Sequence, residues 1–140
     1  MPKGYMPKSK NQEHLTPDRV FELIQEKWDL RKEQFNDPCP AGTPYKAPCF
    51  FNGLYGKWDR WNFVNPPFEV KTLRKFYEKA KEQMMIMNQS IMLLPAKTDQ
   101  DWFHDIIKRQ YEIKWIEGRL KFKGAKDGSM GGHFLVKLGI

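Results

Sequence analysis

Cysteine is scarce in this sequence, and its two cysteines, Cys39 and Cys49, form no CxxC pair. Structural zinc sites need several cysteine or histidine ligands at short characteristic spacings, and no such cluster occurs here. We therefore expect no metal site. We interpret the cysteines as two reduced thiols of a cytoplasmic protein, and a disulfide between them is the alternative.

Long hydrophobic runs are absent as well, since no stretch of 18 apolar residues occurs in the chain. A membrane-spanning helix needs about that length, so we expect no membrane partner. Residues 1–14 are positively charged but lack the apolar segment of a signal peptide, and we interpret them as a flexible basic arm. Residues 15–140 are then the right length for a single domain.

Negative charge is in the minority: 17 acidic residues stand against 24 lysines and arginines, which gives a formal net charge of +7. A small domain with this excess attracts polyanions such as nucleic acids. Many basic domains bind no nucleic acid, so the charge becomes informative only beside a site whose substrate is a base.

The apolar spacing predicts helices that alternate with strands. Thr16 can cap a first helix that extends to about Glu33, with Pro17 and Asp18 in its first turn. Further helices are predicted over 70–87 and after a capping sequence at 98–101. Strands are predicted near 35–37, 49–51, 61–64, 90–94, 111–115 and 134–140. This order indicates an α/β fold whose mostly parallel sheet has about five to seven strands and an antiparallel C-terminal edge.

The residues Asn65-Pro66-Pro67-Phe68 follow the strand 61–64, at the strand end where open α/β sheets place their sites. An aromatic amine is a poor nucleophile because its lone pair is delocalised into the ring. The amide oxygen of Asn65 and the carbonyl of Pro66 can each accept one N–H, which leaves the lone pair directed at an electrophilic methyl group. The prolines keep both acceptors rigid, and Phe68 offers a flat face for a flipped base. A simple turn after a strand is the alternative interpretation.

Several ordered blocks in addition to this motif resemble the phage DNA N6-adenine methyltransferase family, a compact Dam-like group. The resemblance covers roughly residues 16–138. The blocks are Thr16-Pro17, Asp37-Pro38-Cys39-Pro40, Asn52-Gly53-Leu54 with Trp58, Phe63-Val64-Asn65-Pro66-Pro67-Phe68, Leu93-Leu94-Pro95-Ala96, Thr98-Asp99 with Trp102-Phe103-His104, and Gly118-Arg119-Leu120-Lys121-Phe122.

The resemblance implies a Rossmann-like methyltransferase fold of minimal size, S-adenosylmethionine as cofactor and double-stranded DNA as substrate. Asn65, Pro66, Pro67 and Phe68 would form the catalytic motif. Asp37 would face the methionine ammonium of the cofactor. The other residues that the resemblance places at the cofactor are Thr16, Pro17, Pro38, Asn52, Gly53 and Leu54.

The sequence departs from the family pattern at three positions. Asn52 stands where the block usually begins with Asp, Phe68 replaces the commoner Tyr, and the usual glycine-rich loop is missing, with only Gly42 after the Asp37 block. The 26 residues between Phe68 and Pro95 leave no room for a target-recognition domain. Sequence specificity is then either low or supplied by a partner or by a second copy in a homodimer.

Two further groups of side chains are candidates for contacts with DNA. Trp102, Phe103 and His104 could wall the base pocket, although Trp102 also fits the core and His104 a helix surface. The segment 118–132 is predicted to be a basic hairpin or loop. Its cations could bind phosphates, or could belong to a solvated strand: Arg119, Lys121, Lys123 and Lys126.

These observations leave three functions open. The first is methyl transfer to adenine in DNA. The second is methyl transfer by the same motif to RNA bases or to a protein amide, which also present a planar amine. The third is a degenerate relative that binds DNA or cofactor without turnover. The missing glycine-rich loop favours the third function, and the intact motif Asn65–Phe68 favours the first two.

Overall fold

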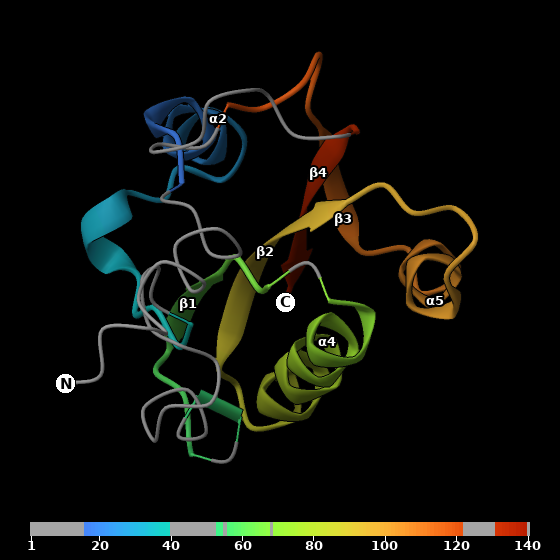
Figure 1. Ribbon diagram of the computed structural model, residues 1–140. Helices are drawn as coiled ribbons and strands as arrows, with labels where there is room; N and C mark the ends of the chain where they lie inside the picture. Colours follow the sequence, from blue (N-terminus) through green and yellow to red (C-terminus); the bar gives the residue numbers. More distant parts are fainter. Residues whose placement is uncertain (1–15, 40–52, 55, 68, 122–130, 140) are drawn as a thin grey trace, which may run out of the picture.

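The computed structural model describes residues 16–39, 53–54, 56–67, 69–121 and 131–139 (Figure 1). The basic arm 1–14 and the strand predicted near 49–51 lie outside these residues. The helices are α2 (Asp18–Trp28), α4 (Val70–Met85) and α5 (Asp101–Lys108), with a 3-10 turn η2 (Lys32–Gln34). The strands are β1 (Trp61–Val64), β2 (Gln89–Pro95), β3 (Glu112–Trp115) and β4 (His133–Leu138). None of the described helices could span a membrane.

The four strands form one mixed sheet in the order β1-β2-β4-β3. β1 and β2 are parallel, and β4 is antiparallel to both of its neighbours, so β3 runs in the same direction as β1 and β2. Asn36 adds an isolated parallel bridge to Asn62 on the outer side of β1. The described part of the sheet thus has fewer strands than the five to seven predicted.

The C-terminal strand pair is antiparallel and forms one edge of the sheet, as predicted. β4 lies inside the sheet, between β2 and β3. Five of its six residues are buried, so the strand has apolar side chains on both faces and ladder partners on both sides. The shorter and more exposed β3 is the outer strand of this pair.

The sheet is covered on both faces, as Figure 1 shows, with α2 on one side and α4 and α5 on the other. The side chains of β2 alternate between the two cores. Ile91 and Leu93 pack in the cluster that contains α2, whereas Met92 and Leu94 pack in the cluster that contains α4 and α5. The continuous apolar run of this strand fits its burial on both faces of the sheet.

The first helix is shorter than predicted at both ends. Its N-cap is Pro17, so Thr16 lies one residue before the cap and does not cap the helix. The helix ends at Trp28 because Asp29 adopts a left-handed conformation, with φ 56°, and its N–H bonds to the carbonyl of Gln25. The chain is then free to turn through η2 and reach the edge of the sheet at Asn36.

The carboxylate of Asp105 holds α4 and α5 together. It accepts hydrogen bonds from the hydroxyl of Tyr77 at 2.6 Å, from Nζ of Lys81 at 3.0 Å and from Nε of Arg109 at 3.0 Å. Burial raises the pKa of this carboxyl, but the three donors outweigh burial and lower the pKa to about 2. The ionised carboxylate thus satisfies the phenol of the fully buried Tyr77.

We expect Asp105→Ala to lower the free energy of unfolding by about 1–3 kcal/mol, because the buried phenol loses its acceptor. The pKa falls from 3.8 to about 2 on folding, so the stabilisation is present above about pH 4 and is lost as the pH falls towards 2. Urea unfolding at neutral and acid pH measures both effects. The control is Asp101→Ala, which removes an exposed ion pair with Arg74 and should cost much less. Equal stability of the two variants at neutral pH would contradict this account.

Candidate active site at the carboxyl edge of the sheet

Asn65 lies directly after β1, at the edge of the sheet where β1 and β2 both end. Val64 points into the core on the α4 side, so the next side chain turns to the α2 side. There Nδ2 of Asn65 donates a hydrogen bond to Oγ1 of Thr16 at 3.1 Å, across 49 positions of the sequence. The structure therefore joins a predicted catalytic residue to a residue predicted to bind the cofactor.

Pro66 and Pro67 are buried, and Asn65 between them and β1 is half-buried. The β1–β2 ladder ends at Val64, just before the two prolines, which lack the N–H that a ladder needs. The backbone at Asn65 is therefore held by a buried strand on one side and by two rings of fixed φ on the other. Phe68 lies outside the described residues.

Asp37 leaves the sheet at the same edge as Asn65. It follows Asn36, which runs parallel to β1 and exchanges backbone hydrogen bonds with Trp61 and Phe63 at 2.9 and 3.0 Å. One carboxyl oxygen of Asp37 accepts the N–H of Cys39 at 2.9 Å. Asp37 is exposed as a residue, but the protein around its carboxyl partly desolvates that group. This desolvation raises the pKa to about 6, against the opposing effect of the Cys39 bond.

The side chain of Asn62 fixes the segment before Asp37 to β1. The sequence interpretation did not identify Asn62 as a residue that shapes the site. Its Nδ2 donates to the carbonyls of Asp59 and Gln89 at 2.8 and 2.9 Å. Its Oδ1 accepts from Nδ2 of Asn36 at 3.0 Å and from the N–H of Asp59 at 3.1 Å. The side chain is fully buried, so each of these bonds replaces one to water. A polar residue inside the apolar strand Trp61–Val64 was the signal that could have found it.

Gly53 and Pro38, which were both predicted at the cofactor, lie against each other. A Cβ on Gly53 would stand 2.0 Å from the carbonyl oxygen of Pro38, so only glycine allows this approach. The carbonyl of Gly53 accepts a hydrogen bond from Nε1 of Trp58 at 2.6 Å. Trp58 is in turn held by its N–H, which donates to Oε1 of Gln83 in α4 at 3.0 Å. Asn52 lies outside the described residues.

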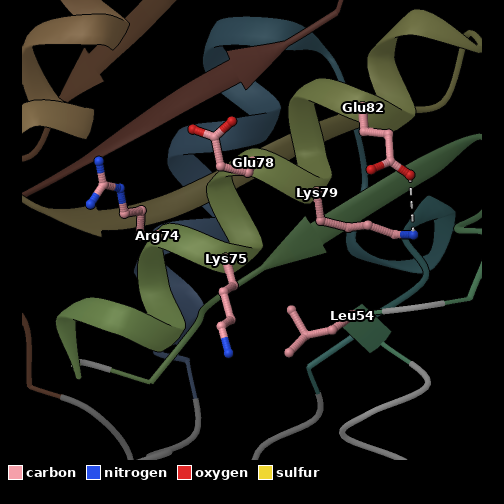
Figure 2. Close-up of a pocket in the computed structure, with 6 residues that line it drawn as sticks. All are labelled: Leu54, Arg74, Lys75, Glu78, Lys79 and Glu82. Atoms are coloured by element: carbon pink, nitrogen blue, oxygen red, sulfur yellow. Dashed lines mark ion pairs between the residues drawn. The ribbon is translucent and has the colours of Figure 1, made fainter.

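Leu54 lines a hollow of about 370 Å³ against the outer surface of α4. Figure 2 shows Leu54 and Lys75 beside each other at the hollow, and Lys79 reaching towards Glu82. The Nζ of Lys79 lies 3.6 Å from the Glu82 carboxylate. Neither Asn65 nor Asp37 lines this hollow, so it is separate from the carboxyl edge of the sheet.

The structure places the three residues predicted to wall a base pocket in two different environments. Trp102 and Phe103 are buried in the core on the α5 side, whereas His104 is exposed with Nε2 2.6 Å from the carbonyl of Thr98. The exposed aromatic ring beside them is Trp115, with 52% of its surface accessible. The centroid of its ring lies 6.3 Å from that of Phe103 and 5.2 Å from that of Phe134, so the ring packs on buried aromatic rings. The sequence interpretation had used Trp115 only as part of a strand pattern.

The predicted basic segment begins at the same edge of the sheet, because it follows β3. Arg119 and Lys121 are exposed on either side of Leu120, which packs under α2 with 1% of its surface accessible. The segment is also held at Glu117, whose carbonyl accepts a hydrogen bond from Arg19 in α2 at 2.5 Å. Lys123 and Lys126 lie outside the described residues.

His133 marks the far side of this edge, where it pairs with Pro95 at the end of β2. Burial lowers its pKa to about 4, against the opposing effect of a hydrogen bond to Gly131. The imidazole is therefore neutral at physiological pH and adds no charge near the ends of the parallel strands.

The raised pKa of Asp37 predicts how one substitution changes stability with pH. Between about pH 4 and pH 6 the folded protein binds more protons at Asp37 than the unfolded chain does, so stability falls as the pH rises through this range. We therefore expect Asp37→Asn to raise the melting temperature at about pH 7.5 and to leave it nearly unchanged at about pH 4. Thermal denaturation measures this, with the exposed Asp99→Asn as control. A lower melting temperature of Asp37→Asn at pH 7.5 would refute the assignment.

The contact between Gly53 and Pro38 predicts a second effect. Gly53→Ala should lower the free energy of unfolding by about 1–3 kcal/mol, because the new methyl group forces the two segments apart. Gly131→Ala is the matched control, since a Cβ there meets nothing within 4 Å. Chemical denaturation of both variants tests the contact, and an unaffected Gly53→Ala would show that the segments do not touch.

Known proteins resemble the chain along most of its length. The model of the family "DNA N-6-adenine-methyltransferase (Dam)" matches residues 3–133. The DNA N-6-adenine-methyltransferase of Escherichia phage T1 is 31% identical, in an alignment that covers 56% of this chain and 44% of the phage protein. The chain thus spans less than half of the length of that relative. No solved structure gives a significant match. The family match over nearly the whole sequence shows that the chain belongs to the DNA N-6-adenine-methyltransferase (Dam) family.

Proposed function

We propose that this protein is a DNA adenine N6-methyltransferase, which transfers a methyl group from S-adenosylmethionine to the exocyclic amine of adenine. The observation that carries the proposal is the position of Asn65. Its amide follows a buried parallel strand, precedes two buried prolines and is bonded to Thr16 at the carboxyl edge of the sheet. The family of the chain supports the same reaction.

The arrangement of the elements supports a minimal Rossmann-like fold. Asn36, β1, β2 and β3 all run in one direction, and only β4 is reversed. Helices cover both faces of the sheet, as in other α/β folds with parallel strands. Ligands of such folds bind outside the carboxyl ends of the strands, which is where Asp37 and Asn65 lie.

The residues at this edge fit the amino-acid end of S-adenosylmethionine. A carboxylate whose pKa is raised by desolvation gains from a nearby cation, and the methionine ammonium is such a cation. Asp37 would hold this ammonium, with Thr16 and Pro17 near it. Pro38 and Gly53, packed against each other, would shape the adjoining wall. The family resemblance places Asn52 near the cofactor as well, whereas Leu54 lines the separate hollow on α4. When bound, the cofactor supplies an electrophilic methyl group on a sulfonium sulfur.

The chemistry at the adenine amine falls to Asn65 and Pro66. Oδ1 of Asn65 accepts one N–H of the amine, and the backbone carbonyl of Pro66 accepts the other. The nitrogen becomes pyramidal, and its lone pair is directed at the methyl group. The amine nitrogen would form the new C–N bond while the bond between the methyl carbon and the sulfonium sulfur breaks and leaves its electron pair on sulfur. The nitrogen would then lose one proton to solvent. Because the strand and the prolines fix both acceptors beforehand, little reorganisation is needed during the reaction.

The substrate must be extruded from the duplex to reach this amide, and several groups favour nucleic acid at the same edge. Phe68 would stack on the flipped adenine, and Trp102, Phe103 and His104 belong to the aromatic cluster that supports Trp115. Arg119 and Lys121, together with Lys123 and Lys126, would bind backbone phosphates.

A degenerate relative that binds DNA or cofactor without turnover is the second candidate, and the missing glycine-rich loop after Pro40 favours it. Calorimetric titration with S-adenosylmethionine, followed by transfer assays on DNA, RNA and protein, separates the candidates. Methyl transfer to DNA alone supports the proposal. Cofactor binding without transfer to any of the three supports the degenerate relative.

The role of Asn65 predicts a large kinetic effect. Asn65→Ala should lower the single-turnover rate by ~10²–10³-fold, the range for the loss of one preorganised electrostatic partner. Affinity for S-adenosylmethionine should change little, because the side chain faces the amine. Asn65→Asp is the matched control, since it keeps an acceptor oxygen and should retain part of the activity. A wild-type rate in a folded Asn65→Ala variant would show that the motif is only a structural turn.

A further inference from the structure

We propose that Thr16 is a positioning residue that orients the amide of Asn65 for methyl transfer. This inference rests on the proposed function and assigns Thr16 a different role from the cofactor contact that its family resemblance implies. Its basis is the hydrogen bond from Nδ2 of Asn65 to Oγ1 of Thr16, 3.1 Å long, between a strand end and the segment that leads into α2.

The orientation of an asparagine amide decides whether this chemistry works. An amide can turn over about its last bond, which exchanges its oxygen and nitrogen while the shape of the side chain stays nearly the same. With Oδ1 towards the substrate, Asn65 accepts an N–H of adenine. With Nδ2 towards the substrate, two donors face each other, and the amine is neither bound nor activated.

The Thr16 hydroxyl holds the amide in place and is satisfied when Oδ1 is left for the substrate. In the structure Nδ2 is engaged by Thr16, so Oδ1 lies on the other branch of the amide. The turned amide would bring Oδ1 to Thr16, which the hydroxyl could also satisfy as a donor, but Nδ2 would then face the adenine amine. With substrate bound, only the observed orientation pairs a donor with an acceptor at both ends of the amide. Thr16 thus holds one end while adenine selects the other.

The hydroxyl can act in this way because Thr16 is itself fixed. Pro17 forms the N-cap of α2 with φ −64°, and its carbonyl accepts the N–H of Val20 at 3.1 Å. Val20 is fully buried against the sheet, and Arg19 binds the carbonyl of Glu117 beyond β3. The position of the Thr16 hydroxyl is therefore set by the packing of α2 and not by a loop of its own.

The test separates this role from cofactor binding. Thr16→Val removes the hydroxyl at nearly constant shape, and Thr16→Ser restores it. We expect Thr16→Val to lower the single-turnover rate at saturating cofactor by about tenfold, in line with one lost hydrogen bond. The dissociation constant for S-adenosylmethionine should change less than about twofold, and Thr16→Ser should return most of the rate. A weakened cofactor affinity with an unchanged rate would overturn the proposal in favour of a cofactor contact.

A double-mutant cycle shows whether Thr16 acts through Asn65. In the Asn65→Ala background there is no amide left to orient, so Thr16→Val should cause no further loss of rate. A further tenfold loss would overturn the proposal, because Thr16 would then act independently. Failure of the proposed function is a separate result, namely no methyl transfer by the wild type to any substrate. Normal transfer by both the wild type and Thr16→Val would instead overturn only the positioning role.

Discussion

The candidate site depends on the buried amide of Asn62. This side chain makes four hydrogen bonds with no access to water, and it joins Asn36, Asp59 and the start of β2 to the middle of β1. An amide buried without those partners would cost free energy. The four bonds therefore disfavour any other alignment of the Asn36 segment along β1. The segment that leads to Asp37 is thereby aligned with β1, and Asp37 and Asn65 leave neighbouring parallel segments at one edge.

The carboxyl edge of the sheet presents two different surfaces. On the outer side of β1, Asp37 and the contact of Pro38 with Gly53 offer a partly desolvated carboxylate and a tightly packed wall, which suit a cationic cofactor. Across β2 and β4, the ring of Trp115 and the side chains of Arg119 and Lys121 are exposed, which suits a nucleic acid. Asn65 lies between the two groups, where a methyl group would have to pass from one ligand to the other.

The sequence predicted those features that local patterns determine. The strand Trp61–Val64, the amphipathic α4 and the doubly buried β2 all follow from apolar spacing, and the position of Asn65 follows from the strand that precedes it. The place of β4 inside the sheet could not be predicted, because strand order depends on pairing between distant segments. The early end of the first helix at Trp28 could not be predicted either, because no glycine or proline marks the left-handed conformation of Asp29. Burial of Trp102 agrees with its interpretation as a core residue, whereas burial of Phe103 depends on how α5 packs against the sheet.

The central claim is that the amide of Asn65 serves methyl transfer to adenine. The most direct measurement is nucleoside analysis of plasmid DNA from a methylation-deficient host that expresses either the wild type or Asn65→Ala at equal levels of folded protein. The account predicts N6-methyladenine with the wild type and little or none with Asn65→Ala. Equal amounts of N6-methyladenine with both proteins, or its absence with the folded wild type, would contradict it.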